Sequence, residues 1–194
     1  MLVFYFAPGT SSMAVHIALH ETGAPFEPRP LSLKTKDTRT SEFLAINPAG
    51  KVPVLLIDGR LLNEVAGCLF YLARKYPKAQ LMPVDDPEAE AQVVSWMSYI
   101  ASTIHPARRQ GLEQARAVYK VADDRLGPNA WCVGGRYSIA DIHLFRLFWR
   151  FRNSLAPDPR DFPNIEAHYQ RMMERPSVRK TIEIESRLGY ELPN

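Results

Sequence analysis

The stretch Asn47–Glu64, NPAGKVPVLLIDGRLLNE, decides how the first part of this chain folds. Asp58-Gly59 stands between two short apolar runs, and this dipeptide is a strong sequence signal for a two-residue β-hairpin turn. Asn63 and Glu64 follow the second run, where a short polar side chain can cap a helix. The stretch therefore predicts a hairpin that leads into a helix, with Asn63 as the N-cap and Glu64 in the first turn.

Val52 and Pro53 stand at the mouth of this hairpin. A proline is tolerated as the first residue of a strand, where its missing N–H is not needed. The Val52-Pro53 bond is also a candidate for the cis form, which is found almost only before proline. Backbone turned outward at Val52 could pair with an extended, peptide-like ligand, as a sheet edge pairs with an added strand.

The segments around the hairpin complete a small α/β unit. Pro28 and Pro30 are two residues apart, so both missing donors point to the same side, as on an exposed edge strand. The expected elements are a strand at 2–6, a helix from 10–12 to Gly23, an edge strand at 25–31, a short helix at 43–46, the hairpin, and an amphipathic helix at 66–73. This β-α-β-α-β-β-α order is the thioredoxin-like arrangement.

Beyond Pro77 the strand signals disappear and helical patterns take over. Pro106 is expected to break the helix that covers 93–104. Ser138 and Asp141 have the spacing of a capping box, which predicts the start of a buried central helix. Further helices are expected at 112–126, after Pro163 and after Pro176. The predicted organisation is an α/β domain at 1–77, a linker at 78–86 and an all-helical domain at 87–194.

Composition argues against several classes of partner. The 194 residues are 46% hydrophobic and 23% charged, which is an ordinary globular composition. The formal net charge is +3, without a dense Lys/Arg block, and this argues against nucleic-acid binding. No apolar run approaches the roughly 20 residues of a membrane span, and the first residues lack the basic start of a signal peptide. We expect a cytoplasmic protein that binds neither nucleic acid nor membranes.

The sequence predicts no metal site. Cys68 and Cys132 have no metal-ligand spacing and form no disulfide framework, so we expect buried free thiols. His16 and His20 lie one helical turn apart and could clasp a metal, but no third ligand follows with motif spacing. We expect these two histidines on the surface or at an interface.

Six short motifs along the chain fit one known family when they are taken together. They are Tyr5 with Pro8-Gly9, 43–48 with 50–53, Leu62-Asn63-Glu64, 99–101 with Ile104-His105, 138–141, and 173–178. In this order and spacing the chain resembles the cytosolic glutathione S-transferase family, most closely its bacterial beta class. The likeness covers nearly the whole chain and implies a thioredoxin-like domain followed by an all-α domain.

The resemblance implies a glutathione site in the first domain. In the family, Val52 before a cis Pro53 pairs its backbone with the cysteinyl part of glutathione. Glu64 and its neighbour Val65 hold the γ-glutamyl end, and a basic residue at the position of Lys36 reaches the glycine carboxylate. The family usually has Ser, or sometimes Gly, at the position of Val65. Val65 keeps the backbone N–H but offers no hydroxyl.

Three residues of the second half match positions that the beta class places near glutathione. His105 matches a site histidine, although Pro106 replaces the basic residue that usually follows it. Ser98 and Ser102 fall where the class has polar site residues on the same helix. His105 is equally compatible with a plain helix-end residue that benefits from the dipole.

The residue expected to touch the glutathione sulfur departs from the class. Beta-class enzymes carry Cys at the position of Ser11, and no cysteine precedes Cys68 in this chain. A serine hydroxyl cannot form a mixed disulfide, but it can donate a hydrogen bond to the thiolate and favour its ionisation. Ser12 competes with Ser11, and both are also compatible with helix caps. Tyr5 is the third candidate donor, although a tyrosine inside a strand is more often part of the core.

The sequence therefore predicts a cytosolic glutathione S-transferase of the detoxification type. It would take glutathione as co-substrate, without a metal, and stabilise its thiolate for attack on a small hydrophobic electrophile. Two alternatives stay open: a glutathione-binding or scaffold protein of the same fold with little transferase activity, or a glutathione-dependent isomerase, lyase or dehalogenase. The resemblance also implies a homodimer.

Overall fold

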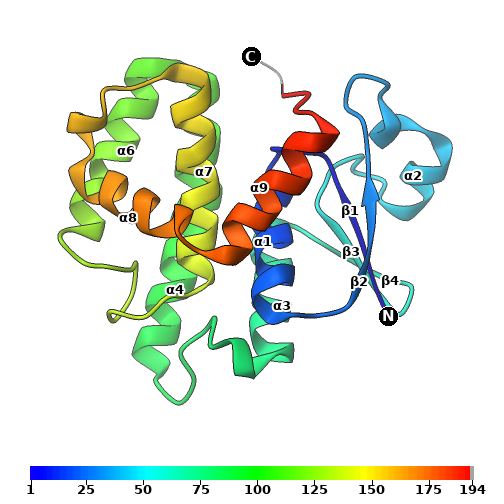
Figure 1. Ribbon diagram of the computed structural model, residues 1–194, viewed down its shortest axis with the longest axis horizontal. Helices are drawn as coiled ribbons and strands as arrows, with labels where there is room; N and C mark the ends of the chain where they lie inside the picture. The colour runs from blue at the N-terminus through cyan, green and yellow to red at the C-terminus, as the bar shows by residue number, and fades with distance from the viewer. Residues whose placement is uncertain (193–194) are drawn as a thin grey trace. The chain divides into compact units, whose positions relative to one another are not determined.

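A computed structural model describes residues 1–192 of the chain. The chain forms two compact units, whose elements are labelled in Figure 1. The first unit contains Met1–Tyr76 together with the chain from Pro176 onward, and the second contains Pro77–Arg175. The expected architecture, a thioredoxin-like unit with a mixed sheet and an all-helical unit, is confirmed.

The first unit is built on a four-stranded sheet in the order β2-β1-β3-β4. Its strands are β1 (Leu2–Phe6), β2 (Phe26–Pro30), β3 (Val54–Ile57) and β4 (Arg60–Asn63). β1 pairs with β2 in parallel and with β3 antiparallel, and β3 pairs antiparallel with β4. The strand that carries Pro28 and Pro30 lies at the sheet edge, as the missing backbone donors predict.

The hairpin between β3 and β4 forms as predicted. Asp58 and Gly59 both have positive φ, 49° and 80°, which a two-residue hairpin turn of the favoured twist requires. The Val52-Pro53 bond is cis. One prediction about this stretch is wrong: Asn63 pairs with Val54 as the last residue of β4 and caps no helix. Glu64 takes the N-cap position instead, because strand pairing extends one residue further than expected.

The described residues of the first unit also form four α-helices and one short 3₁₀ turn. They are α1 (Ser12–Thr22), η1 (Asp37–Arg39), α2 (Ser41–Ile46), α3 (Val65–Lys75) and α9 (Pro176–Leu188). Gly23 ends α1 in the left-handed conformation with φ 63°, which glycine adopts without a steric penalty.

Helix α9 groups with the first unit, although the predicted organisation places it in the all-helical domain. It lies along α1 (Figure 1). The contact is polar as well as apolar: the buried Glu185 carboxylate accepts hydrogen bonds from His16 Nδ1 at 2.8 Å and from the Gly9 backbone N–H at 2.6 Å. His16 is 1% exposed. This histidine was expected on the surface or at an interface, but it is buried inside the first unit, because its partner comes from 169 residues further along the chain.

The second unit is helical throughout, apart from loops and a single isolated bridge between Val133 and Arg136. Its elements are η2 (Pro77–Ala79), α4 (Pro87–Tyr99), η3 (Ile100–Ile104), α5 (His105–Ala107), η4 (Arg108–Gln110), α6 (Leu112–Leu126), α7 (Ile139–Leu155), η5 (Pro159–Asp161) and α8 (Pro163–Met173).

Pro106 does not break its helix as predicted. The chain passes from α4 into a π-helical turn, η3, in which His105 N–H bonds to Ile100 O, five residues back. Pro106 then occupies the first turn of α5. Because the π turn shifts the hydrogen-bond register directly before the proline, its missing N–H interrupts no ladder.

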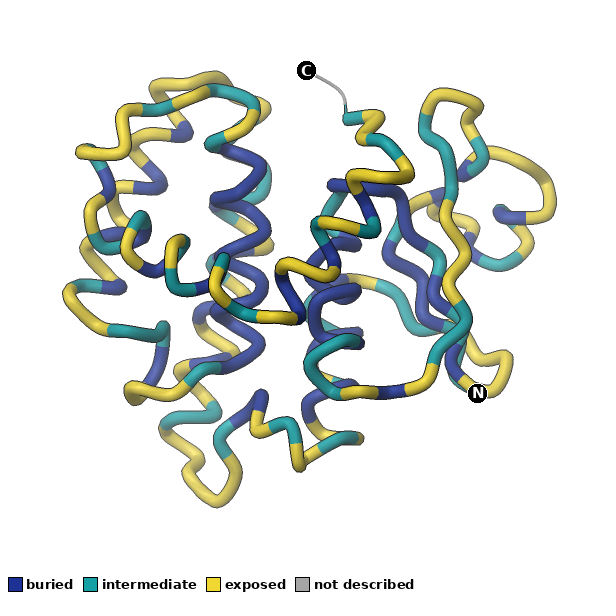
Figure 2. Tube along the Cα trace, viewed as in Figure 1, coloured by how far each residue is buried: buried dark blue, intermediate teal, exposed yellow. Residues whose placement is uncertain are grey.

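Helix α7 is the core of the second unit. Every residue from Ile139 to Phe151 is buried, and the helix is dark blue along most of its length in Figure 2. The predicted capping box is present at its start: Ser138 N–H donates to Asp141 Oδ2 at 2.8 Å, and Ala140 N–H donates to Ser138 Oγ at 3.3 Å. Among the described residues, none of the helices has the length and hydropathy to cross a membrane.

His143 on α7 makes the stability of this unit sensitive to acid. Burial lowers the pKa of His143 to about 3, and His105 and Arg146 add to the shift. The unfolded chain, with an ordinary histidine pKa near 6.5, therefore binds a proton that the folded chain does not. Stability contributed by neutral His143 is present above pH ~6.5 and is lost as pH falls toward ~3.

We expect His143→Leu to flatten this dependence. The free energy of unfolding of the parent should fall between pH 7 and pH 5 by up to ~1.4 kcal/mol per pH unit from this one group, whereas the variant lacks that contribution. Urea titrations at pH 7, 6 and 5 measure the difference. Equal slopes in the two proteins would show that His143 is not the acid-sensitive group.

Candidate functional site

The strand register gathers the candidate residues of the first unit at one edge of the sheet, the one formed by the ends of its strands. Tyr5 pairs with Val54, which in turn pairs with Asn63. Residues 6–12 therefore leave β1 at the edge where Val52 and Pro53 enter β3 and Glu64 leaves β4. On the other side of β1, Leu31 N–H bonds to Phe6 O at 2.8 Å, so the loop that carries Lys36 starts at the same edge. These segments are far apart in sequence, and only the pairing brings them together.

The two candidate serines have different environments. Ser12 is fully buried, and its hydroxyl donates to Ala7 O at 3.2 Å, lies 2.7 Å from Thr10 Oγ1 and accepts from Ala7 N–H at 3.3 Å. Ser11 is half-buried and stands at the N-cap of α1, where its side chain caps no helical N–H. No described residue takes a hydrogen bond from the Ser11 hydroxyl. The hydroxyl of Ser12 is thus committed to the loop, whereas that of Ser11 can bind a ligand.

Tyr5 behaves as a packing residue in β1. Its ring lies edge-on to Phe43 of α2, with centroids 5.8 Å apart, and it is half-buried in the strand. Phe43 is 3% exposed, so the pair anchors α2 to the sheet. This contact favours a core role for Tyr5 over the role of a donor to the sulfur.

Glu64 has an unusual backbone conformation at the start of α3. Its φ is 62° and its ψ is 131°, a region that a residue with a side chain occupies at a cost of ~1–3 kcal/mol. Its side chain is exposed and caps no N–H of its own helix. The carboxylate therefore lies at the positive end of α3 beside Val65, where it could meet an ammonium group while the helix N–H groups meet a carboxylate.

Close contacts with neighbouring residues hold the remaining loops of this edge. Asn47 Nδ2 donates to Lys51 O at 2.8 Å and shapes the turn before Val52. A Cβ atom at Gly50 would lie 2.5 Å from Arg39 Nη1 and 2.9 Å from Thr38 O. Only glycine fits there, so the turn packs directly against η1. Lys36, exposed with φ 61°, immediately precedes η1.

Ser98, Ser102 and His105 belong to the second unit. Ser98 is exposed on α4, and Ser102 is exposed on η3, where its hydroxyl lies 3.2 Å from Thr103 Oγ1. His105 is half-buried at the start of α5. Their spacing of four and three residues places the three side chains along one face of a continuous helical run.

Neither cysteine offers a reactive thiolate. Burial, with a smaller effect of Glu64, raises the pKa of the Cys68 thiol to about 12. Burial, with Asp141 beside it, also raises the pKa of Cys132 well above its usual value. Both thiols are protonated at neutral pH, and a thiol in that state is inert.

Cys132, Asp141 and His168 bring three potential metal ligands within 4.8 Å of one another. Asp141 already accepts four hydrogen bonds, from Cys132 N–H at 2.8 Å, His168 Nε2 at 3.1 Å, and the N–H and hydroxyl of Ser138 at 2.8 and 3.0 Å. A cation would have to displace these donors. The cluster is a buried hydrogen-bond network that ties α7, α8 and the preceding loop together.

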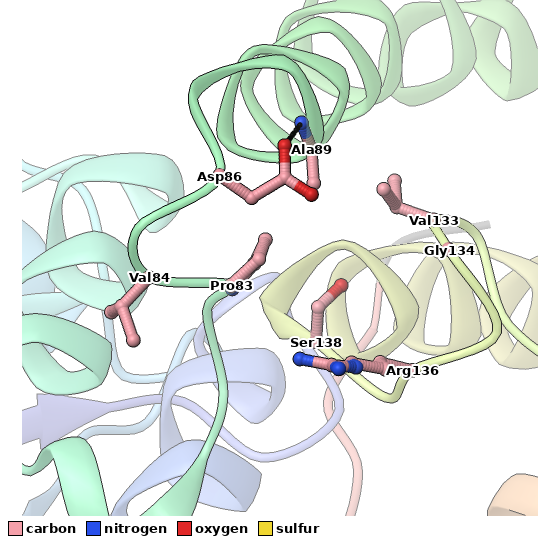
Figure 3. Close-up of a pocket in the computed structure, with 8 residues that line it drawn as sticks. All are labelled: Pro83, Val84, Asp86, Ala89, Val133, Gly134, Arg136 and Ser138. Carbon is pink, nitrogen blue, oxygen red and sulfur yellow. Dashed lines mark hydrogen bonds between the residues drawn. The ribbon is translucent and has the colours of Figure 1, made fainter.

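A cavity of about 340 Å³ lies in the second unit, and none of the candidate site residues lines it. Figure 3 shows it between the segment that leads into α4, with Pro83 and Asp86, and the loop before α7, with Val133 and Arg136. The Asp86 carboxylate caps α4 by accepting from Ala89 N–H at 3.0 Å. The cavity thus follows from the way in which two helix starts meet.

Sequence reasoning missed Glu185, which ties His16 and Gly9 to α9. The residue lies in a polar-looking helix, and nothing local marks it as a buried acid. Its partner His16 lies 169 residues away in the sequence, so no spacing connects the two residues.

Comparisons with known proteins match both halves of the chain. The family model described as glutathione S-transferase, N-terminal domain, matches residues 10–75, and the model described as glutathione S-transferase, C-terminal domain, matches residues 84–176. The curated protein glutathione S-transferase GstA of Escherichia coli O157:H7 is 31% identical over 95% of this chain and 98% of its own length.

Solved structures agree with these matches. A glutathione transferase homologue from sulfitobacter, solved with bound glutathione, is 33% identical with a TM-score of 0.83, covering 95% of this chain and 98% of that one. A bacterial beta-class glutathione S-transferase from Sphingomonas chungbukensis is 31% identical with a TM-score of 0.82, covering 94% and 98%.

Proposed function

Because the chain belongs to the glutathione S-transferase family, we propose that it binds glutathione as co-substrate and stabilises its thiolate for attack on a small hydrophobic electrophile. The observation that carries this proposal is the difference between the two serines. The Ser12 hydroxyl is buried and bonded within its loop, whereas Ser11 presents an uncommitted hydroxyl at the start of α1.

Ser11 would act as the donor to the sulfur. An O–H donor stabilises a thiolate more than a thiol, and the positive end of α1 acts in the same direction. Serine offers no sulfur of its own, and both cysteines of the chain have raised pKa values. The proposed chemistry is therefore direct attack by the glutathione thiolate, without a mixed disulfide to the protein.

The rest of the sheet edge would hold the tripeptide. Val52, before Pro53, would pair its backbone with the cysteinyl part, and Glu64 would bind the γ-glutamyl ammonium. The N–H of Val65, at the start of α3, would bind the neighbouring carboxylate. Lys36 would supply the counter-charge for the glycine carboxylate.

The second unit would contribute Ser98, Ser102 and His105, as the beta-class resemblance implies. We also propose a cytoplasmic homodimer and a role in detoxification. Phe70 on α3 is 47% exposed, which supports an apolar contact with a second copy.

Val65 favours one alternative, a glutathione-binding or scaffold protein with little turnover. Val65 lacks the hydroxyl that the family usually places beside the γ-glutamyl carboxylate, so the substrate would be held by one hydrogen bond fewer. A glutathione-dependent isomerase, lyase or dehalogenase would use the same thiolate on a different substrate. A turnover screen that includes aromatic electrophiles, isomerisable substrates and haloalkanes separates these three functions.

Calorimetric titration with glutathione tests the proposal at its base. The transferase and the glutathione-dependent enzymes require saturable binding of one glutathione per chain. A chain that binds glutathione and turns over none of the screened substrates would be the binding protein. Absence of any heat of binding at millimolar glutathione would refute the proposed function.

We expect Glu64→Gln to weaken glutathione binding by about ten- to a hundredfold. The variant keeps the side-chain volume but removes the charge that would pair with the ammonium, and a hydrogen bond to a charged group contributes ~1.5–3 kcal/mol. Calorimetry measures the dissociation constant. Glu183 is an exposed acid on α9 that pairs with Arg187. Glu183→Gln is therefore the matched control and should bind glutathione like the parent. Equal affinity of both variants would remove Glu64 from the site.

A further inference from the structure

The residues that follow α9 lie across two loops of the first unit. We call this segment, Gly189–Leu192, the C-terminal strap. Its Glu191 Oε2 accepts hydrogen bonds from Ser32 Oγ at 2.6 Å and from Lys34 N–H at 2.9 Å. The strap therefore contacts the loop that leads from β2 to Lys36.

Glu191 completes the internal bonding of that loop. Ser32 Oγ, which Glu191 binds, also accepts from Thr35 N–H at 3.1 Å. At the other side of the loop, the Asp37 carboxylate accepts from Ser32 N–H at 2.8 Å and from the Thr35 hydroxyl at 2.6 Å. Two carboxylates thus fix residues 32–37, and one of them comes from a position 159 residues further along the chain.

The same strap covers the loop between β1 and α1. A Cβ atom at Gly9 would lie 2.8 Å from Tyr190 Cδ1 and 2.8 Å from Leu192 Cδ1. The backbone of Gly9 has φ 72°, and its N–H donates to Glu185 of α9. Gly9 therefore packs directly beneath the strap, two residues before Ser11.

We propose that Glu191 is a positioning residue for glutathione, acting through Lys36. This inference rests on the proposed function, in which Ser11 contacts the sulfur and Lys36 contacts the glycine carboxylate. Those two groups would bind the central cysteinyl residue and the glycine end of one tripeptide, and the strap touches the loops that carry both. By ordering the Lys36 loop before the ligand arrives, Glu191 lowers the conformational entropy lost on binding.

Because Glu191 is exposed to solvent, we expect its contribution to glutathione affinity to be modest. The two hydrogen bonds hold the pKa of its carboxyl below the usual value, with Ser32 the larger cause and the Lys34 N–H the next. Glu191 is therefore ionised at neutral pH and accepts from both donors. Without Glu191 the loop loses about one net hydrogen bond that orders it. This loss corresponds to a three- to tenfold larger dissociation constant for glutathione.

The experiment compares Glu191→Ala, Glu191→Gln and the parent by calorimetry with glutathione and by steady-state kinetics. Glu191→Ala should raise the dissociation constant and the KM for glutathione about three- to tenfold, with kcat at saturating glutathione unchanged. Glu191→Gln keeps an oxygen acceptor and should recover part of the loss. Glu183→Gln on α9 serves as the control and should match the parent.

Amide hydrogen exchange provides a readout that needs no glutathione. The Lys34 amide, which bonds to Glu191, should exchange faster in Glu191→Ala, while amides of β1 and β3 keep their protection. A purely structural role would instead lower the melting temperature and kcat together and leave the affinity of the folded fraction unchanged.

The outcomes separate this inference from the proposed function. If the parent binds no glutathione, both fail. If the parent binds and Glu191→Ala binds with the same dissociation constant, the proposed function stands and the positioning role of Glu191 is overturned. If affinity falls and the Lys34 amide loses protection, the role is supported.

Discussion

Replacing Ser11 with alanine is expected to lower kcat/KM by about a hundredfold, the usual cost of removing one donor from a developing or stabilised anion. The same change should raise the pKa of the bound glutathione thiol by about one to two units, because each unit corresponds to ~1.4 kcal/mol of lost preference for the thiolate. The pH dependence of kcat/KM and the thiolate absorbance of bound glutathione measure the two effects.

Ser12→Ala is the matched control for that experiment. Because the Ser12 hydroxyl bonds to Ala7 and lies beside Thr10, its loss should lower stability and leave the thiol pKa close to that of the parent. Ser11→Cys is a second test of position. It should form a mixed disulfide with oxidised glutathione, detectable by mass. An unchanged pH profile in Ser11→Ala would remove Ser11 as the donor.

Asp141→Ala is expected to have the largest effect on stability, a loss of ~3–5 kcal/mol in the free energy of unfolding. The side chain is fully buried and accepts hydrogen bonds from Cys132, Ser138 and His168. Its removal leaves all of these donors without a partner and opens the capping box of α7. Urea or thermal unfolding measures the loss.

Two further variants define how Asp141 acts. Asp141→Asn keeps one oxygen acceptor and should lose less stability than alanine. Asp124 is an exposed acid on α6 that pairs with Lys120. Asp124→Ala should change the free energy of unfolding little, because surface ion pairs contribute little to stability. A loss in Asp141→Ala no larger than that in Asp124→Ala would contradict the network.

The parts of the fold that follow local rules could be predicted from the sequence. Asp58-Gly59 specifies its turn through backbone conformations that few other residues adopt, and Ser138 with Asp141 specifies a helix start through bonds within four residues. The proline-bearing edge strand follows from missing donors. In each of these cases the determining interaction lies within a few residues or within one strand.

The remaining features depend on partners distant in sequence. Glu185 reaches His16 and Gly9 across 169 and 176 residues, so neither the burial of His16 nor the grouping of α9 with the first unit has a local signal. Pro106 is a helix breaker by local rules, and those rules do not indicate the π turn that directly precedes it. At the candidate site, burial distinguishes Ser12 from Ser11, and no pattern in the two adjacent serines does so.

The structure of the chain in complex with glutathione tests the central claim most directly. The account predicts one glutathione in the first unit, with its sulfur within hydrogen-bonding distance of Ser11 Oγ and its γ-glutamyl group beside Glu64 and the Val65 N–H. A sulfur that is hydrogen-bonded to the Tyr5 hydroxyl, or a tripeptide bound away from this sheet edge, would contradict this prediction.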